Sequence, residues 1–176
     1  TAEGQYFNIT NLGAILFARN IELFDGLARK AVRVIQYHGT NKFKTIKEQI
    51  GKKGYANGFS GLISYITSVL PANEEIGKAF RHESSLYPQI AIRELVANCI
   101  IHQDFGITGT SPMIEIYDNR IEITNPGKPL IPTWRFIDHS PESRNEKLAK
   151  FMRMIKICEE RGSGIDKVVA ARELYQ

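Results

Sequence analysis

The 176-residue sequence lacks any long apolar run. No stretch approaches the roughly 18 residues that a membrane-spanning helix needs. The first four residues, Thr-Ala-Glu-Gly, have neither the basic start nor the apolar core of a signal peptide. We therefore expect no membrane partner and a cytoplasmic location. Because the chain begins with Thr, we also expect it to be a piece of a longer protein.

Cysteine is scarce, with two residues in the whole chain, Cys99 and Cys158. Both lie in apolar, helix-like stretches without Cys-x-x-Cys spacing, which argues against a disulfide framework and against a zinc site. We expect two core thiols. The hydrophobic content of 43% is ordinary for one compact domain, and the net charge of +4 permits an anionic partner without requiring one.

Lysine is absent between Lys78 and Lys128, and this stretch contains the most informative segment of the chain, residues 87–104. Pro88 suits the first turn of a helix, and no glycine follows before Gly106. The sequence therefore predicts a helix here, and most of its side chains are apolar.

Three polar residues of this helix, Glu94, Asn98 and His102, are spaced four apart, so they form one narrow stripe. A solvated helix face normally carries lysines, and this one has none. Buried polar groups are costly unless something satisfies them. We therefore predict that the stripe lines a cavity for a ligand.

Apolar spacing predicts the other elements. Helices are expected at 11–18, capped by Thr10, at 58–70 and at 145–157, and strands at 30–37 and 75–86. Residues 113–125 alternate as a β-hairpin with its turn at Asp118-Asn119.

A cluster of five lysines lies in residues 41–53, at positions 42, 44, 47, 52 and 53. Such a cluster can contact a phosphate backbone, but few aromatic residues lie among these lysines. A solvated helix or loop is the favoured interpretation. Direct nucleic-acid binding stays open as an alternative.

Two glycine-containing turns are candidate parts of a site. In Asn125-Pro126-Gly127 the glycine lets the backbone come close to a bound group. In Arg161-Gly162-Ser163-Gly164, which opens a predicted helix, free backbone N–H groups can face an anion. Between the two turns, the proline-rich residues 128–141 predict a long loop of the kind that closes over a site.

Taken in order, these features resemble the ATP-binding domain of the gyrase, Hsp90, histidine-kinase and MutL (GHKL) superfamily. Within it, the chain is most similar to the C-terminal ATPase-like domain of bacterial transcriptional regulators of the RecG-helicase-related, or Schlafen AlbA, type. The matching segments are 93–98, 102–105, 118–127, 143–145 and 160–165, whereas the first 86 residues match more loosely.

The resemblance implies an α/β two-layer sandwich of the Bergerat type, with a mixed β-sheet and helices on one face. Residues 1–86 would form a helix-strand-helix-strand part and residues 87–176 would carry the ATP-binding motifs, together in one compact domain. The family continues through further C-terminal strands and carries a DNA-binding segment upstream. We therefore expect a truncated sheet and DNA contact through a separate domain.

The resemblance also implies ATP and Mg²⁺ as ligands, with slow, Mg-dependent ATPase activity left open. Glu94 would polarise the attacking water, and Asn98 would hold Mg²⁺. Asn125 stands where the family has an aspartate that accepts a hydrogen bond from adenine, and Gly127 would let the base approach. An asparagine oxygen can still accept that bond, but the preference for adenine is then open.

The remaining expected site residues are less firmly assigned. Gly162, Ser163 and Gly164 would cradle the phosphates, with charge added by Arg161. His102 and Asp104 would be either neighbours of the ligand or parts of the helix end. The rival interpretations are a catalytically inactive scaffold or dimerisation module, assembled as a homodimer, and the direct nucleic-acid binding already described.

Overall fold

Four strands form one mixed sheet in the order β2-β1-β5-β6. They belong to a computed structural model that describes residues 8–76, 81–85, 87–135 and 142–158. Strand β1 (Val32–Tyr37) runs antiparallel to β2 (Thr45–Gly51) and parallel to β5 (Met113–Ile116), and β5 runs antiparallel to β6 (Ile121–Thr124). The predicted hairpin is confirmed, because Tyr117 N–H donates to Arg120 O across the Asp118-Asn119 turn.

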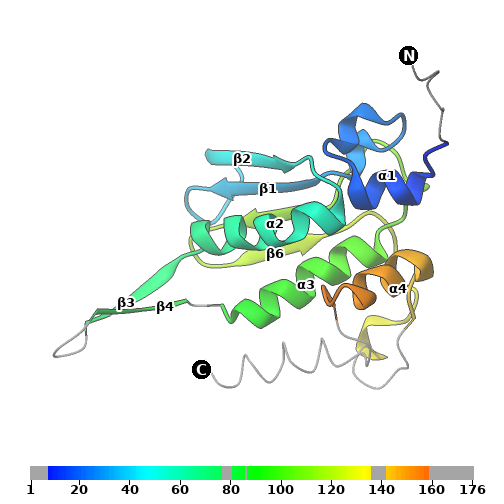
Figure 1. Ribbon diagram of the computed structural model, residues 1–176. Helices are drawn as coiled ribbons and strands as arrows, with labels where there is room; N and C mark the ends of the chain where they lie inside the picture. The colour runs from blue at the N-terminus through cyan, green and yellow to red at the C-terminus, as the bar shows by residue number, and fades with distance from the viewer. Residues whose placement is uncertain (1–7, 77–80, 86, 136–141, 159–176) are drawn as a thin grey trace, which may run out of the picture.

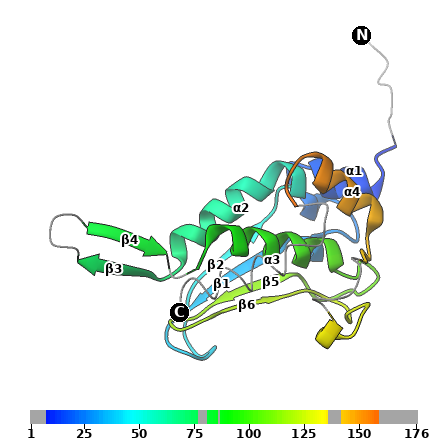
Figure 2. The same cartoon turned by 90° about the horizontal axis from the view of Figure 1, so that it is seen from below.

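Four α-helices lie on one face of this sheet, as Figure 2 shows. They are α1 (Asn11–Phe17), α2 (Tyr55–Val69), α3 (Gln89–His102) and α4 (Glu146–Met154). Short 3₁₀ turns occur at Ile21–Leu23, Ala28–Lys30 and Thr133–Arg135. The predicted α/β sandwich, with a mixed sheet covered by helices on one face, is confirmed.

The amino-terminal cap of α1 also agrees with the sequence. The Thr10 hydroxyl accepts a hydrogen bond from Gly13 N–H at 3.1 Å, so one of the unpaired donors of the first turn is satisfied. Among the described residues, no helix is long and apolar enough to cross a membrane.

Two predicted segments are corrected. The strand predicted at 75–86 is wrong, because the described residues of this range belong to two strands, β3 (Ala72–Ile76) and β4 (Arg81–Ser85), which pair antiparallel with Ile76 opposite Arg81. This hairpin projects from the body between α2 and α3 (Figures 1 and 2). Within residues 41–53, the middle part is neither helix nor loop, because Thr45–Gly51 forms β2 and pairs with β1, whereas 41–44 and 52–53 are irregular.

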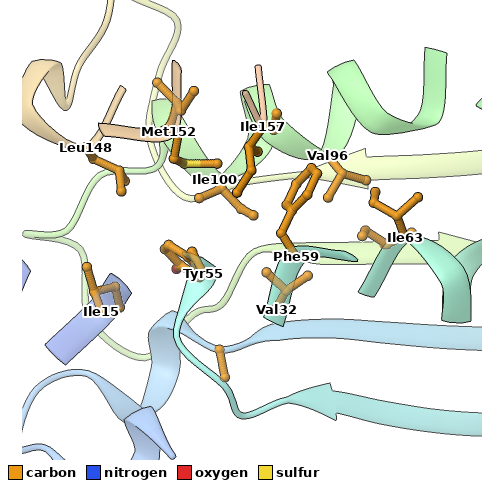
Figure 3. Packing of buried hydrophobic residues seen from close by; sticks show 14 of the residues in the cluster. Ile15, Val32, Tyr55, Phe59, Ile63, Val96, Ile100, Leu148, Met152 and Ile157 are labelled. Atoms are coloured by element: carbon orange, nitrogen blue, oxygen red, sulfur yellow. The ribbon is translucent and has the colours of Figure 1, made fainter. Parts of the chain in front are cut away.

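The apolar core joins residues from both halves of the chain. Phe59 and Ile63 of α2 lie beside Val96 of α3, and Met152 of α4 lies beside Ile100 (Figure 3). A fully buried side chain of this size contributes about 1.5–3 kcal/mol by leaving water. The core therefore holds α3 between the sheet, α2 and α4.

Candidate functional site

Helix α3 is buried on nearly all sides, and its polar stripe is shielded with it. The Glu94 side chain is only 5% exposed, whereas Asn98 and His102 are half-buried. Carboxylate and amide groups are seldom placed this deeply without a partner, and Glu94 has an interaction partner. The assignment of catalysis to Glu94 and of Mg²⁺ binding to Asn98 stays a prediction.

The amino-terminal half of α3 lies beside the segment that leads to the predicted phosphate cradle. Arg93 Nη2 donates to Lys156 O at 2.7 Å. Burial, followed by the negative charge of Glu94, raises the pKa of the Cys158 thiol, so Cys158 also lies near the stripe. Arg161, Gly162, Ser163 and Gly164 lie outside the described residues. Their phosphate-binding role stays a prediction.

The Asn-Pro-Gly turn is attached to the other end of α3. The Cys99 thiol donates to Thr124 O at 3.2 Å, and Asp104 N–H donates to Pro126 O at 2.7 Å. The Asn125 side-chain nitrogen donates to Pro126 O at 3.3 Å. These bonds fix the turn beside the end of the polar stripe. The contact of Asn125 with a base stays a prediction.

Gly127 has a backbone conformation that favours glycine, with φ +117°. A Cβ added there would lie 3.0 Å from Asp104 Cβ and 3.7 Å from Arg144 Cζ. Glycine is therefore required here because the turn packs closely against Asp104, independently of any ligand that approaches the turn.

The carboxyl end of α3 is held by charged and polar groups. Asp104 Oδ1 accepts from Gly106 N–H at 2.9 Å, and Asp104 Oδ2 lies 3.4 Å from Arg144 Nη1. Burial and the nearby Arg144 charge lower the pKa of His102, so its imidazole is neutral at pH 7. For Asp104, these contacts favour the helix-end interpretation.

Sequence patterns did not reveal a buried network beneath this end. Lys30 is 2% exposed and donates to Ile107 O at 2.7 Å and Asp104 O at 3.4 Å. The Tyr55 hydroxyl donates to Lys30 O at 2.6 Å and accepts from Gln103 Nε2 at 2.8 Å. Burial lowers the pKa of Lys30 and raises that of Tyr55. A lysine at the start of a predicted apolar strand carries no sequence signal of such a role, and in the structure it ends a 3₁₀ turn just before β1.

A pocket of about 670 Å³ lies next to this network. Its walls come from α1, from residues 25–27 with Lys30, from Phe105 and Thr108, and from residues 143–148. Glu94, Asn98 and Asn125 do not line it. The pocket therefore adjoins the Asp104 and Arg144 contact rather than the middle of the polar stripe.

The residues of the stripe fit a magnesium ion better than a metal bound wholly by protein. Among the described residues, no group of three or more His, Cys, Asp or Glu side chains is placed to hold a metal. Mg²⁺ commonly keeps water and phosphate oxygens and uses one or two protein ligands. The half-buried Asn98 amide beside the Glu94 carboxylate is compatible with that mode of binding.

Comparison with protein families agrees with the sequence motifs. Residues 109–176 match the model described as "Putative ATP-dependent DNA helicase recG C-terminal". Over this segment, the chain resembles the ATPase-like family related to RecG. The match confirms the RecG-related, ATPase-like part of the resemblance stated from the motifs. The matched segment begins just after α3, so it leaves out the motifs at 93–98 and 102–105, and it contains β5, β6 and α4.

A solved structure shows the same fold. The DIP2311 protein from Corynebacterium diphtheriae superposes with a TM-score of 0.70 at 19% identity, over 91% of this chain and 34% of that protein. The chain thus spans about a third of that protein's length. Among curated proteins, none matches the chain.

Proposed function

We propose that this chain binds Mg-ATP and serves as the nucleotide-binding module of a bacterial transcriptional regulator whose DNA contacts lie in a separate domain. The observation that carries the proposal is the position of α3. At one end of its polar stripe, Arg93 bonds to Lys156, in the segment that leads to the predicted phosphate cradle. At the other end, Asp104 N–H bonds to Pro126 of the Asn-Pro-Gly turn. The match of the RecG-related segment to an ATPase-like family supports the same ligand.

The residues of the stripe have the chemistry that this ligand needs. Bound Mg-ATP supplies the cation and the phosphoanhydride. The Asn98 oxygen would hold the cation, and the buried Glu94 carboxylate would orient a water molecule and accept its proton. The neutral His102 imidazole can donate one hydrogen bond to a phosphate oxygen without adding charge. The Gly162-Ser163-Gly164 turn, with Arg161, would cradle the phosphates.

The base would lie against the turn at the end of β6. The Asn125 side-chain oxygen would accept a hydrogen bond from the adenine amino group, and Gly127 would allow close approach. An asparagine can also donate through its nitrogen, so GTP is the appropriate competitor to test. If no base binds, the asparagine at position 125, where the family has an aspartate, would explain the loss. The scaffold or dimerisation module is then the favoured alternative.

The test is a thermal-shift titration of wild-type protein with Mg²⁺ and ATP, ADP or GTP. Nucleotide at 100 times its Kd should stabilise by about 2.7 kcal/mol, which for a chain of this size raises Tm by roughly 5–10 °C. Asn98→Ala should reduce the shift, and Asn119→Ala, in the exposed hairpin turn, should leave it unchanged. Glu94→Gln should retain the shift and abolish any release of phosphate.

Each outcome has a distinct meaning. If no nucleotide shifts the wild type, the Mg-ATP proposal fails and the scaffold alternative replaces it. Sedimentation of the full-length protein would then decide whether it forms a homodimer. Equal shifts in wild type and Asn98→Ala would remove Asn98 from the metal site. Phosphate release that survives Glu94→Gln would remove Glu94 from its catalytic role.

A further inference from the structure

Three segments that are far apart in sequence meet at the carboxyl end of α3. They are the helix end itself, the Asn-Pro-Gly turn after β6, and the residues that start α4. Arg144 belongs to the third segment, and its guanidinium contacts the other two: Nε donates to His102 O at 3.2 Å, Nη1 lies 3.4 Å from Asp104 Oδ2, and Nη2 donates to Lys128 O. Lys128 directly follows the turn, so one planar group joins the two sides of the candidate site.

The carbonyl groups at a helix end have no partners within the helix. In α3 the Ile100 carbonyl accepts from the Gln103 side chain, whereas the carbonyls of residues 101–103 receive donors from residues 144 and 145. Asn145 Nδ2 donates to Ile101 O and to Gln103 O, each at 2.7 Å, beside the Arg144 bond to His102 O. The orientation of the last turn of α3 therefore depends on the position of these two side chains.

The Asn-Pro-Gly turn is linked to Arg144 through Asp104. Asp104 N–H donates to Pro126 O at 2.7 Å, while its carboxylate faces Arg144. The positive φ of Gly127 brings the turn to where an added Cβ would lie 3.7 Å from Arg144 Cζ. A shift of the guanidinium would therefore loosen the helix end and the turn together, with the Asn145 bonds and the Asp104 N–H bond still in place.

We propose that Arg144 is a positioning residue that fixes the carboxyl end of α3, with His102, against the Asn-Pro-Gly turn, and so sets the affinity for nucleotide. This inference rests on the proposed function, because Arg144 joins His102, assigned there to a phosphate oxygen, to the turn assigned to the base. Arg144 acts through His102, Asp104 and the turn. Supporting groups of this kind commonly change affinity by about ten- to a hundredfold when they are removed.

The decisive variant is Arg144→Lys, which keeps the charge. A lysine ammonium on a flexible stem cannot reproduce the planar fork that spans three acceptors. In the wild type, local opening of the helix end must break the three Arg144 contacts, which we call the clamp, whereas in the variant these contacts are already lost. We therefore expect the amide hydrogen of Asp104 to exchange with solvent at least about tenfold faster. We expect the Kd values of ATP and ADP to rise by the same factor, about tenfold. Arg29→Lys, at an exposed position without these contacts, is the matched control and should behave as wild type.

The experiment combines calorimetric titration with hydrogen exchange measured by NMR. Unchanged Asp104 exchange in Arg144→Lys overturns the clamp, whether or not nucleotide binds. Unchanged Kd values, with binding to the wild type intact, overturn the positioning role while leaving the proposed function in place. A larger loss for ATP than for ADP would mean direct contact with the terminal phosphate and would also overturn it. Arg144→Gln, which can still donate to His102 O, replaces Arg144→Lys if the lysine variant does not fold.

Discussion

Gly127 illustrates how one residue can meet two requirements. The sequence predicts that glycine at this turn allows a bound group to approach the backbone. The structure adds that φ is +117° and that the position of a Cβ is only 3.0 Å from Asp104 Cβ. The glycine is therefore needed for the turn to pack against the end of α3, whatever ligand binds there.

We predict that Gly127→Ala lowers the free energy of unfolding by about 1–3 kcal/mol, because alanine is strained at this φ and its methyl group crowds Asp104. Urea denaturation measures the change. Gly61→Ala, at a helical position with open space around it, is the control and should stabilise by about 0.5–1 kcal/mol. Equal midpoints for Gly127→Ala and wild type would contradict the packing argument.

The burial of the polar stripe of α3 could be predicted from the sequence, whereas the burial of Lys30 could not. Glu94, Asn98 and His102 could be singled out because their spacing on an apolar helix is unusual, and all three prove to be shielded. Lys30 could not be singled out, because its buried position depends on carbonyl groups of Asp104 and Ile107, which lie far along the chain.

At the scale of elements, carbonyl groups at the carboxyl ends of α1 and α3 accept hydrogen bonds from side chains of other elements. The end of α1 receives a hydrogen bond from Asn57 Nδ2 of α2 to Phe17 O, at 2.8 Å. The end of α3 receives two from Asn145, which starts α4. Asn145 makes no side-chain cap for α4 itself. The Asn145 side chain thus stabilises the end of α3 rather than the start of α4.

We predict that Asn145→Ala lowers the free energy of unfolding by about 1–3 kcal/mol, because it leaves two part-buried carbonyl groups without this donor. Amide exchange in the last turn of α3 should also become faster. The matched control, Asn57→Ala, removes a similar bond at an exposed helix end, and water can replace it there. We expect a loss below about 1 kcal/mol for this control. Equal losses in the two variants would show that burial of the α3 end has no effect.

The segments that sequence patterns misassigned are those whose form is decided by pairing. Strand β2 is mostly exposed and lies within the lysine cluster, a pattern that fits a loop as well as a strand, and only its antiparallel register with β1 defines it. Likewise, β3 and β4 form a hairpin whose two strands pair with each other. Helices were predicted more accurately because their apolar spacing is local.

At the scale of the whole molecule, most lysines of the densest positive cluster contact other groups of the protein. In residues 41–53, Lys42 pairs with Glu115 at 2.7 Å and Lys52 pairs with Glu22 at 2.8 Å. The Lys47 ammonium lies 5.3 Å from the centre of the Tyr65 ring. Three of the five lysines of the cluster are thus engaged within the protein, which weakens the direct nucleic-acid alternative.

We predict that this chain binds duplex DNA no more tightly than about 0.1 mM at physiological salt, the weak end of nonspecific binding. Fluorescence anisotropy at several salt concentrations measures the affinity, with and without Mg-ATP. A double variant, Lys44→Met and Lys53→Met, tests the two remaining lysines and should bind no differently. Micromolar binding that falls steeply with salt and is lost in the double variant would favour the nucleic-acid alternative.

The sequence by itself predicted the four helices that lie in the described residues, the hairpin at 113–125 and the order of the motifs that resemble an ATPase, and that resemblance implied the α/β sandwich. These depend on apolar periodicity and on glycine and proline positions, which act over a few residues. Only the tertiary structure decided that residues 144 and 145 cap α3, that Lys30 is buried beneath it, and that β2 is a strand. The first two depend on donors and acceptors that meet across long separations in the chain, and the third depends on the register with β1, which the apolar pattern of β2 alone does not encode.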